Sequence, residues 1–188
     1  MVFKEIIAID LETTGFSSSK DEILEFGAVA KRQNTLRYFN RLVQIEKPIP
    51  DKIIQLTGID EKTLIDEKAQ PLKICLEEFI KFIFLNTKFP LLVGHNIKRF
   101  DLKFLKASLA RERMRCLSRL HVWDTMTNHR KDKALKRKNG AKSDLGSTCS
   151  FYGISNYDAS HRAGPDALRA LTIYEKQRNN RKLSYEIL

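Results

Sequence analysis

The sequence contains little cysteine, no long apolar run and no repeated or low-complexity segment. Its three cysteines, Cys75, Cys116 and Cys149, are an odd number without Cys-x-x-Cys spacing. We interpret them as buried free thiols of a reducing compartment rather than as a disulfide scaffold. No apolar stretch is long enough to span a bilayer, and no signal peptide precedes the first apolar segment. These absences predict a cytoplasmic protein without a membrane anchor.

The length and composition fit one folded unit. With 188 residues, of which 42% are hydrophobic, the chain is able to bury a sizeable core and is not a disordered segment. A second catalytic domain would not fit in this length. We therefore expect a single domain over residues 1–178, followed by a short polar tail over residues 179–188.

Basic residues outnumber acidic ones. The chain has 34 lysines and arginines against 23 aspartates and glutamates, a net charge of +11, which favours encounter with a polyanion such as nucleic acid. The excess is greatest in residues 129–142, where Asp132 is the single acid. The basic residues there are Arg130, Lys131, Lys133, Lys136, Arg137, Lys138 and Lys142. Two interpretations stay open, a solvated loop or a nucleic-acid patch centred on Lys136, Arg137 and Lys138.

The distribution of apolar residues predicts a sheet with helices. The predicted strands cover residues 3–11, 22–30, 36–45, 89–94 and 121–124. Short polar links join the first three, which suits antiparallel hairpins. A helix that begins near Lys98 separates the last two, which suits a parallel pair with a right-handed crossover. Further helices are predicted at residues 51–67, from Pro71, at 144–151 and at 165–177. The pattern predicts an α/β fold with a mixed five-stranded sheet, three antiparallel strands followed by two parallel ones, flanked by helices.

Two acids stand where the first predicted strand ends, in the sequence IIAIDLETTG. Side chains alternate along a strand, so Asp10 and Glu12 face the same side. Carboxylates that are held together repel one another unless a cation lies between them, and a divalent metal ion suits that place. Taken alone, the two acids could also mark the point where a buried strand reaches solvent.

Two further acids and a histidine lie downstream. Asp101 ends the sequence GHNIKRFD, and His161 and Asp166 share the sequence HRAGPDA. Four carboxylates with one histidine suit Mg²⁺ or Mn²⁺ better than zinc, which favours histidine and cysteine. Without the other motifs, His161 would be interpreted as an exposed loop histidine.

Together these motifs resemble those of the DnaQ-like exonucleases of the DEDDh type, the family of the epsilon proofreading subunit of bacterial DNA polymerase III, RNase T and oligoribonuclease. The first motif is DLETTG at residues 10–15. The second comprises the His-Asn and Phe-Asp pairs at 95–96 and 100–101, and the third is HRAGPDA at 161–167. Weaker similarity fills the intervals, so the resemblance covers nearly the whole chain. It implies an RNase H-like fold and a site for two divalent ions, Mg²⁺ or Mn²⁺.

The resemblance also implies a catalytic role for each of these residues. Asp10, Glu12 and Asp166 would hold the ion that activates the attacking water. Asp10 would also touch a second ion, which Asp101 would support. His161 would be the general base, because a histidine can accept a proton close to neutral pH.

Residues around the motifs would bind the substrate. By resemblance these are Leu11, Thr13, Thr14, Gly15, Asn96, Phe100 and His161. Simpler alternatives stay open for most of them: the Thr-Thr-Gly sequence forms a turn, Asn96 caps the following helix, and Phe100 packs in the core.

The predicted activity is metal-dependent 3′→5′ exonucleolytic hydrolysis of single-stranded or frayed DNA, with release of nucleoside 5′-monophosphates, in proofreading or repair. Two alternatives stay open: an RNA exonuclease resembling RNase T or oligoribonuclease, and a non-catalytic nucleic-acid-binding accessory module of a polymerase. We expect no polymerase-binding tail after the third motif. A free-standing nuclease and a nuclease partnered with a DNA polymerase both fit the sequence, which does not determine the oligomeric state.

Overall fold

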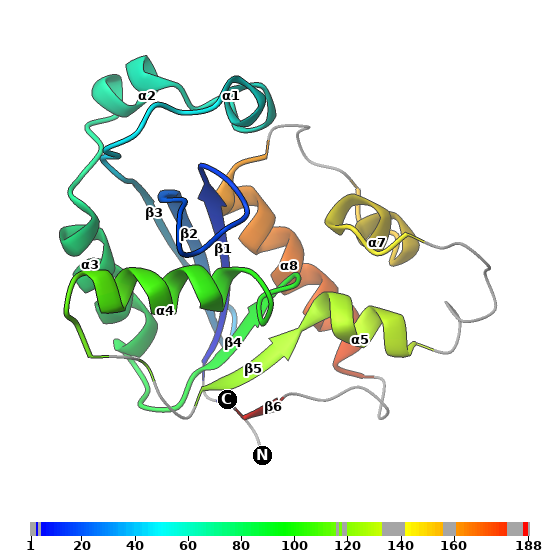
Figure 1. The fold of residues 1–188 in the computed structure, drawn as a ribbon. Helices are drawn as coiled ribbons and strands as arrows, with labels where there is room; N and C mark the ends of the chain where they lie inside the picture. The colour runs from blue at the N-terminus through cyan, green and yellow to red at the C-terminus, as the bar shows by residue number, and fades with distance from the viewer. Residues whose placement is uncertain are drawn as a thin grey trace.

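The computed structural model describes residues 3, 5–115, 117, 120–132, 142–155, 161–179 and 186–187, which form a six-stranded mixed sheet with helices (Figure 1). The strands are β1 Ile6–Thr13, β2 Ile23–Arg32, β3 Thr35–Leu42, β4 Leu91–Gly94, β5 His121–Asp124 and β6 Glu186–Ile187. They lie in the order β3-β2-β1-β4-β5-β6. β1 is therefore an inner strand, antiparallel to β2 on one side and parallel to β4 on the other.

The five predicted strands are present, and their predicted directions are confirmed. β1, β2 and β3 form the antiparallel meander, and β4 and β5 form the parallel pair. β6 was not predicted, and it pairs antiparallel with β5 inside the segment expected to be a polar tail. The domain boundary after residue 178 stays a prediction, because most residues beyond it lie outside the described part of the chain.

Helices cover both faces of the sheet (Figure 1). Those described are α1 Asp51–Thr57, α2 Glu61–Asp66, α3 Leu72–Phe84, α4 Asp101–Arg111, α5 Thr125–Lys131, α7 Leu145–Phe151 and α8 Ala163–Gln177. α3 and α4 lie on one face, and α5, α7 and α8 lie on the other. α1 and α2 lie beyond the end to which the β1 arrow points.

Two helix starts differ from the prediction by two or more residues, and one helix was not predicted. α4 begins at Asp101 rather than near Lys98, because Asn96 has a left-handed backbone (φ 67°) and a turn follows it. α8 begins at Ala163, before the expected Pro165. α5 was not predicted, and the Asp124 side chain caps it by accepting a hydrogen bond from the N–H of Thr127 at 2.9 Å.

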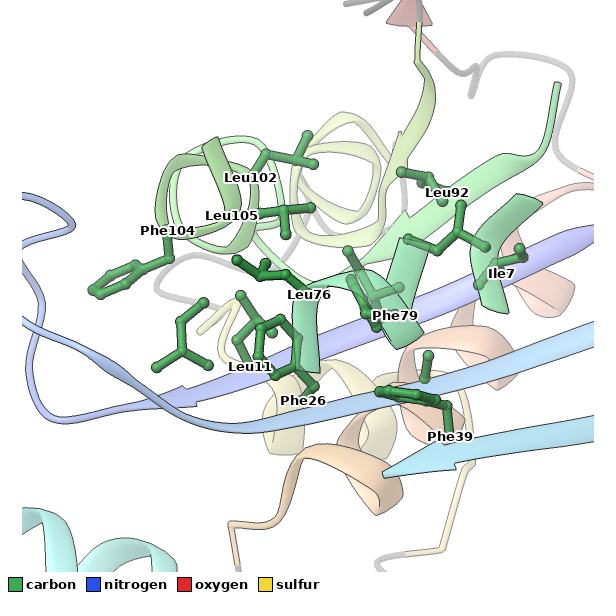
Figure 2. Close-up of a cluster of buried hydrophobic side chains, with 14 of the residues drawn as sticks. Ile7, Leu11, Phe26, Phe39, Leu76, Phe79, Leu92, Leu102, Phe104 and Leu105 are labelled. Carbon is green, nitrogen blue, oxygen red and sulfur yellow. The ribbon is translucent and has the colours of Figure 1, made fainter. Parts of the chain in front are cut away.

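Alternate residues of the central strands form the core beneath α3 and α4. Ile7, Ile9 and Leu11 of β1 point to this face, and Phe26 of β2 packs on Phe79 of α3 with ring centroids 5.0 Å apart. Figure 2 shows this cluster together with the leucines and phenylalanine that α4 contributes. Because the odd-numbered residues of β1 fill this core, its even-numbered residues face α8.

The start of α8 rests directly on the backbone of β2. Gly27 of β2 is paired with Asp10 of β1. A Cβ atom on Gly27 would lie 2.1 Å from the carbonyl carbon of Ala163 and 2.4 Å from the nitrogen of Gly164. The buried face of α8 continues with small residues, Ala167 and Ala170. Glycine and alanine therefore set how closely the helix approaches the sheet.

The other expectations about burial concern the cysteines and the membrane. Cys75 and Cys149 are buried free thiols, as expected, whereas Cys116 lies outside the described residues. Across the described ranges, the helices are too short or too polar to cross a membrane.

Gly27→Ala should destabilise the fold by about 1–3 kcal/mol, the usual range for overpacking, because the added methyl group overlaps the backbone of Ala163 and Gly164. Gly146→Ala in α7 is the matched control. A Cβ atom there meets Asp144 Oδ1 at an ordinary 3.6 Å, and alanine suits a helix better than glycine. Urea unfolding of both variants measures the difference. Wild-type stability of Gly27→Ala would contradict the close approach of α8.

Candidate active site

The two acids of β1 face α8. Asp10 and Glu12 are partly buried and lie on the side of β1 opposite to its core residues. In the ladder with β2, Asp10 is opposite Gly27 and Glu12 is opposite Glu25. Three carboxylates therefore lie on one small patch of the sheet, directly under the first turn of α8.

Asp101 reaches the same place from the loop after β4. It is the first residue of α4 and is 2% exposed. Its Oδ1 accepts a hydrogen bond from the N–H of Leu11 at 3.0 Å. Since β1 and β4 are parallel neighbours, the chain leaves both strands at the same edge of the sheet. This hydrogen bond holds the start of α4 against the backbone of β1 at Leu11, the residue between Asp10 and Glu12.

α8 and the residues just before it supply the last acid and the histidine of the predicted catalytic set. Asp166 lies on the buried face of the helix and is 4% exposed, whereas the side chain of His161, just before the helix, is 54% exposed. His161 Nδ1 lies 3.8 Å from Asp166 Oδ2. Glu12, His161 and Asp166 each offer one ligand atom, and these atoms all lie within 4.8 Å of one another. They form the candidate metal group within the described residues.

The carboxylates of this cluster resist ionisation. Burial, and then the charge of Asp101, raise the pKa of Asp10 well above its usual range. Burial raises the pKa of Glu12 to about 8, with a further contribution from the charge of Asp166. Burial also raises the pKa of Asp101 to about 7. Neighbouring carboxylates ionise together only when positive charge is near, so the site favours a bound cation.

The Thr-Thr-Gly sequence forms a turn at the same edge. Thr13 Oγ1 donates a hydrogen bond to the carbonyl of Gly15 at 2.6 Å. The N–H of Thr14 donates to the carbonyl of Glu22 at 2.9 Å. A Cβ atom on Gly15 would lie within 2.9 Å of three side-chain atoms of Asp21. The turn thus has a structural reason for its glycine, and contact with a substrate stays a prediction.

The residues of the second motif have separate structural places. Asn96 does not cap α4, whose N-cap is Phe100 without a side-chain bond, so the capping prediction was wrong. Within the described part of the chain, Asn96 Oδ1 is buried without a hydrogen-bond partner. Phe100 packs against Phe104 with ring centroids 5.0 Å apart, and the side chain of Leu11 lies in the core.

The predicted nucleic-acid patch, Lys136, Arg137 and Lys138, lies outside the described residues. At the described margins of the basic segment, Arg130 Nε donates a hydrogen bond to Ser143 Oγ at 2.9 Å. The choice between a solvated loop and a nucleic-acid patch therefore stays open.

The sequence profile of the RNase T family, described as "Exonuclease", matches residues 7–174. The match includes all three motifs. The chain belongs to the RNase T family of exonucleases. The resemblance to DnaQ-like exonucleases is thereby confirmed.

The curated proteins that are similar to this chain include much larger proteins. A PolC-type DNA polymerase III of Ureaplasma parvum is 30% identical over 183 residues, 93% of this chain and 11% of that protein. An epsilon subunit of DNA polymerase III from Aquifex aeolicus is 33% identical over 100 residues, 53% of this chain and 46% of the relative. The 3′-5′ exonuclease DinG of Bacillus subtilis is 36% identical over 108 residues, 56% of this chain and 11% of that protein. This chain thus spans less than half of each of these relatives.

A solved 3′-exonuclease, described as recognising the 3′ end of a histone mRNA stem-loop, shares the fold. The TM-score is 0.75 with 17% identity, and the match covers 100% of this chain and 92% of that chain. The RNase H-like fold implied by the sequence motifs is therefore confirmed.

Three charged residues of the candidate site were missed in the sequence analysis. Glu25 is fully buried and pairs with Arg162, with Arg162 Nη2 2.8 Å from Glu25 Oε1. Arg169 pairs with Asp166 Oδ1 one turn along α8. Burial raises the pKa of Asp166, and the charge of Arg169 opposes that rise. Two signals were available in the sequence: an acid inside an apolar strand, which is Glu25, and an arginine three residues after a helical aspartate, which is Arg169.

Glu12 should make the metal-free protein less stable as the pH rises from about 5 to about 8. Its folded pKa of about 8 exceeds that of an unfolded glutamate, about 4.3, so the folded state binds more protons and loses stability as they leave. With EDTA present, the melting temperature of the wild type should fall more steeply over this range than that of Glu12→Gln. Glu77→Gln, exposed on α3, should keep the wild-type slope. Parallel curves for wild type and Glu12→Gln would contradict the raised pKa.

Proposed function

We propose that the chain is a metal-dependent 3′→5′ exonuclease that hydrolyses phosphodiester bonds at the 3′ ends of single-stranded or frayed DNA and releases nucleoside 5′-monophosphates. The observation that carries the proposal is the convergence of four carboxylates and a histidine from three separate elements. They are Asp10 and Glu12 of β1, Asp101 of α4, and His161 and Asp166 at the start of α8. Membership of the exonuclease family and a relative named for 3′-5′ exonuclease activity support this direction of cleavage.

Two divalent ions, Mg²⁺ or Mn²⁺, fit this donor set. The donors are mainly carboxylate oxygens, which these ions prefer, and the raised pKa values of Asp10 and Glu12 favour a bound cation. Asp10, Glu12 and Asp166 would hold one ion, and Asp10 with Asp101 would hold the other. When bound, such ions supply an activated water and stabilise the attacking and leaving oxygens.

His161 would accept the proton of the attacking water. Its side chain is largely exposed just before α8, so it can meet a water that approaches from solvent. Arg169 holds Asp166 Oδ1, while Asp166 Oδ2 lies on the side of His161. The same carboxylate would thus serve a metal ion and help to orient the base.

The terminal nucleotide would lie against the turn after β1 and the loop after β4. Thr13, Thr14 and Gly15 form the turn at the edge where the acids gather. Asn96 lies in the loop after β4, and its buried amide oxygen has no hydrogen-bond partner in the described part of the chain. Beyond the terminal nucleotide, the sugar-phosphate backbone of the substrate strand would follow the basic segment centred on Arg137.

DNA is the proposed substrate because relatives over most or half of the chain are DNA polymerase III proteins. Frayed ends in proofreading or repair are the setting that these names suggest, and a DNA polymerase is the corresponding partner. The structurally similar 3′-exonuclease that recognises a histone mRNA stem-loop makes RNA the alternative to be tested.

A time course on matched oligomers of DNA and RNA tests the proposal. With Mg²⁺ or Mn²⁺, a 5′ label should appear on a ladder of shortened products, and a 3′ label should appear at once in a mononucleotide. EDTA and Asp10→Ala should both abolish the reaction. Cleavage from the 5′ end, or no cleavage by the wild type, would overturn the proposed activity. If RNA is cleaved faster than DNA, the proposed substrate changes from DNA to RNA.

His161→Ala should lower kcat by on the order of 10²–10⁴-fold, the usual loss when a general base is removed. Mn²⁺ binding, measured by calorimetry without substrate, should change little because all four carboxylates remain. His121→Gln, at the far end of β5 from Asp124, is the control and should keep the wild-type rate. An equally large loss of Mn²⁺ affinity in His161→Ala would make this histidine a metal ligand instead of the base.

A further inference from the structure

Glu25 is a fully buried carboxylate beside the catalytic cluster, and it is saturated with donors from α8 and β3. Arg162 Nε donates to both of its oxygens, at 3.0 and 3.1 Å, and Arg162 Nη2 donates to Oε1 at 2.8 Å. The N–H of Ala163 donates to Oε2 at 2.9 Å. Asn40 Nδ2 donates to Oε1 at 2.8 Å. Both carboxylate oxygens of Glu25 are thus hydrogen-bonded to the beginning of α8.

These contacts hold the segment that carries the proposed base and the last proposed metal ligand. His161 directly precedes Arg162, and Asp166 follows Ala163 within the first turn of α8. The neighbouring Gly27 lies on the same face of β2 and receives the backbone of Ala163. Two residues of β2 therefore position the start of α8. Gly27 permits the close approach of the helix, and Glu25 fixes the orientation of its first residues.

At this position a carboxylate is electrostatically unfavourable if its role is only to hold the helix start in place. Glu25 is directly opposite Glu12 in the ladder, and it adds negative charge to a site that already holds four acids. Its counter-charge is the guanidinium of Arg162, whose planar donor fork fixes orientation as well as charge. Arg162 also reaches Glu67 after α2, at 3.5 Å. Together, the contacts of Arg162 with Glu25 and Glu67 define the position of the backbone at residues 161–163.

We propose that Glu25 is a positioning residue, which uses Arg162 and the N–H of Ala163 to hold His161 and Asp166 in register with Glu12. The inference rests on the proposed function, because it assigns Glu25 a part in the same exonuclease site. Glu25 itself touches neither the substrate nor a metal ion. Its effect is transmitted through the start of α8.

A second buried ion pair provides a matched control. Glu5, which precedes β1, is 1% exposed and accepts hydrogen bonds from Arg37 at 2.7 Å and from Asn86 at 3.1 Å. Glu25 is likewise bound by an arginine and an asparagine. Glu5 lies at the opposite end of β1 from the acids, so loss of its charge disturbs the fold without reaching the site.

Glu25→Gln and Glu5→Gln should both lower the melting temperature, but only Glu25→Gln should impair the site. We expect kcat at saturating DNA to fall on the order of 10²-fold, the size of effect of a misplacement of about 1 Å. Calorimetry without substrate should show weaker Mn²⁺ binding, because Asp166 moves from Glu12. KM should change little. Glu5→Gln should keep the wild-type kcat and Mn²⁺ affinity.

A double variant separates positioning from stability. Glu25→Gln with Arg162→Gln also removes the guanidinium that has lost its main partner, so its melting temperature should recover toward that of the wild type while kcat and Mn²⁺ affinity stay low. Wild-type kcat and Mn²⁺ affinity in the folded Glu25→Gln or double variant would overturn the proposal. So would equal losses of both in Glu5→Gln.

A measurement that does not depend on cleavage distinguishes this inference from the proposed function. Hydrogen exchange at residues 163–166 should be faster in Glu25→Gln and unchanged in Glu5→Gln. If the wild type cleaves no oligomer, the proposed function fails, and the exchange and Mn²⁺ results still decide whether Glu25 positions this segment. Unchanged exchange in Glu25→Gln would refute the positioning role even in an active enzyme.

Discussion

The close contact between the start of α8 and the β1–β2 pair is the constraint on which the site depends. Asp10 and Glu12 are fixed by the ladder of hydrogen bonds within the sheet. Asp166 reaches them because the backbone of Ala163 lies against Gly27, where a side chain would not fit. A metal site tolerates only small displacements of its ligands, so the spacing between one helix and two strands determines whether the acids act together.

Charge at this contact is balanced locally. Arg162 pairs with Glu25 and Arg169 pairs with Asp166, so two of the acids at the start of α8 each have a guanidinium as partner. Asp10, at the middle of the group, carries the raised pKa that results from burial and from Asp101. The repulsion that remains is the physical basis for binding a divalent ion, which stabilises the folded state by mass action. Apolar clusters on both faces of the sheet contribute stability that does not depend on metal.

Much of the fold follows from local patterns. Alternation in β1 placed Asp10 and Glu12 on one face, and short polar links predicted the antiparallel meander. Other features had no periodic signal. β6 has two residues, too few to show alternation. α5 depends on a cap by Asp124. The capping role predicted for Asn96 failed because its left-handed backbone begins a turn, which delays α4 until Asp101.

The sequence by itself determined the family, the five longer strands and the identity of the candidate catalytic residues, because the motifs are short and each lies within one segment. The tertiary structure decided how those segments meet. Glu25 and Arg162 are 137 positions apart, and no local pattern joins them. Asp101 bonds to Leu11 across 90 positions. Such contacts depend on strand order and on how closely a helix packs, and these follow from the packing of the whole chain rather than from any one motif.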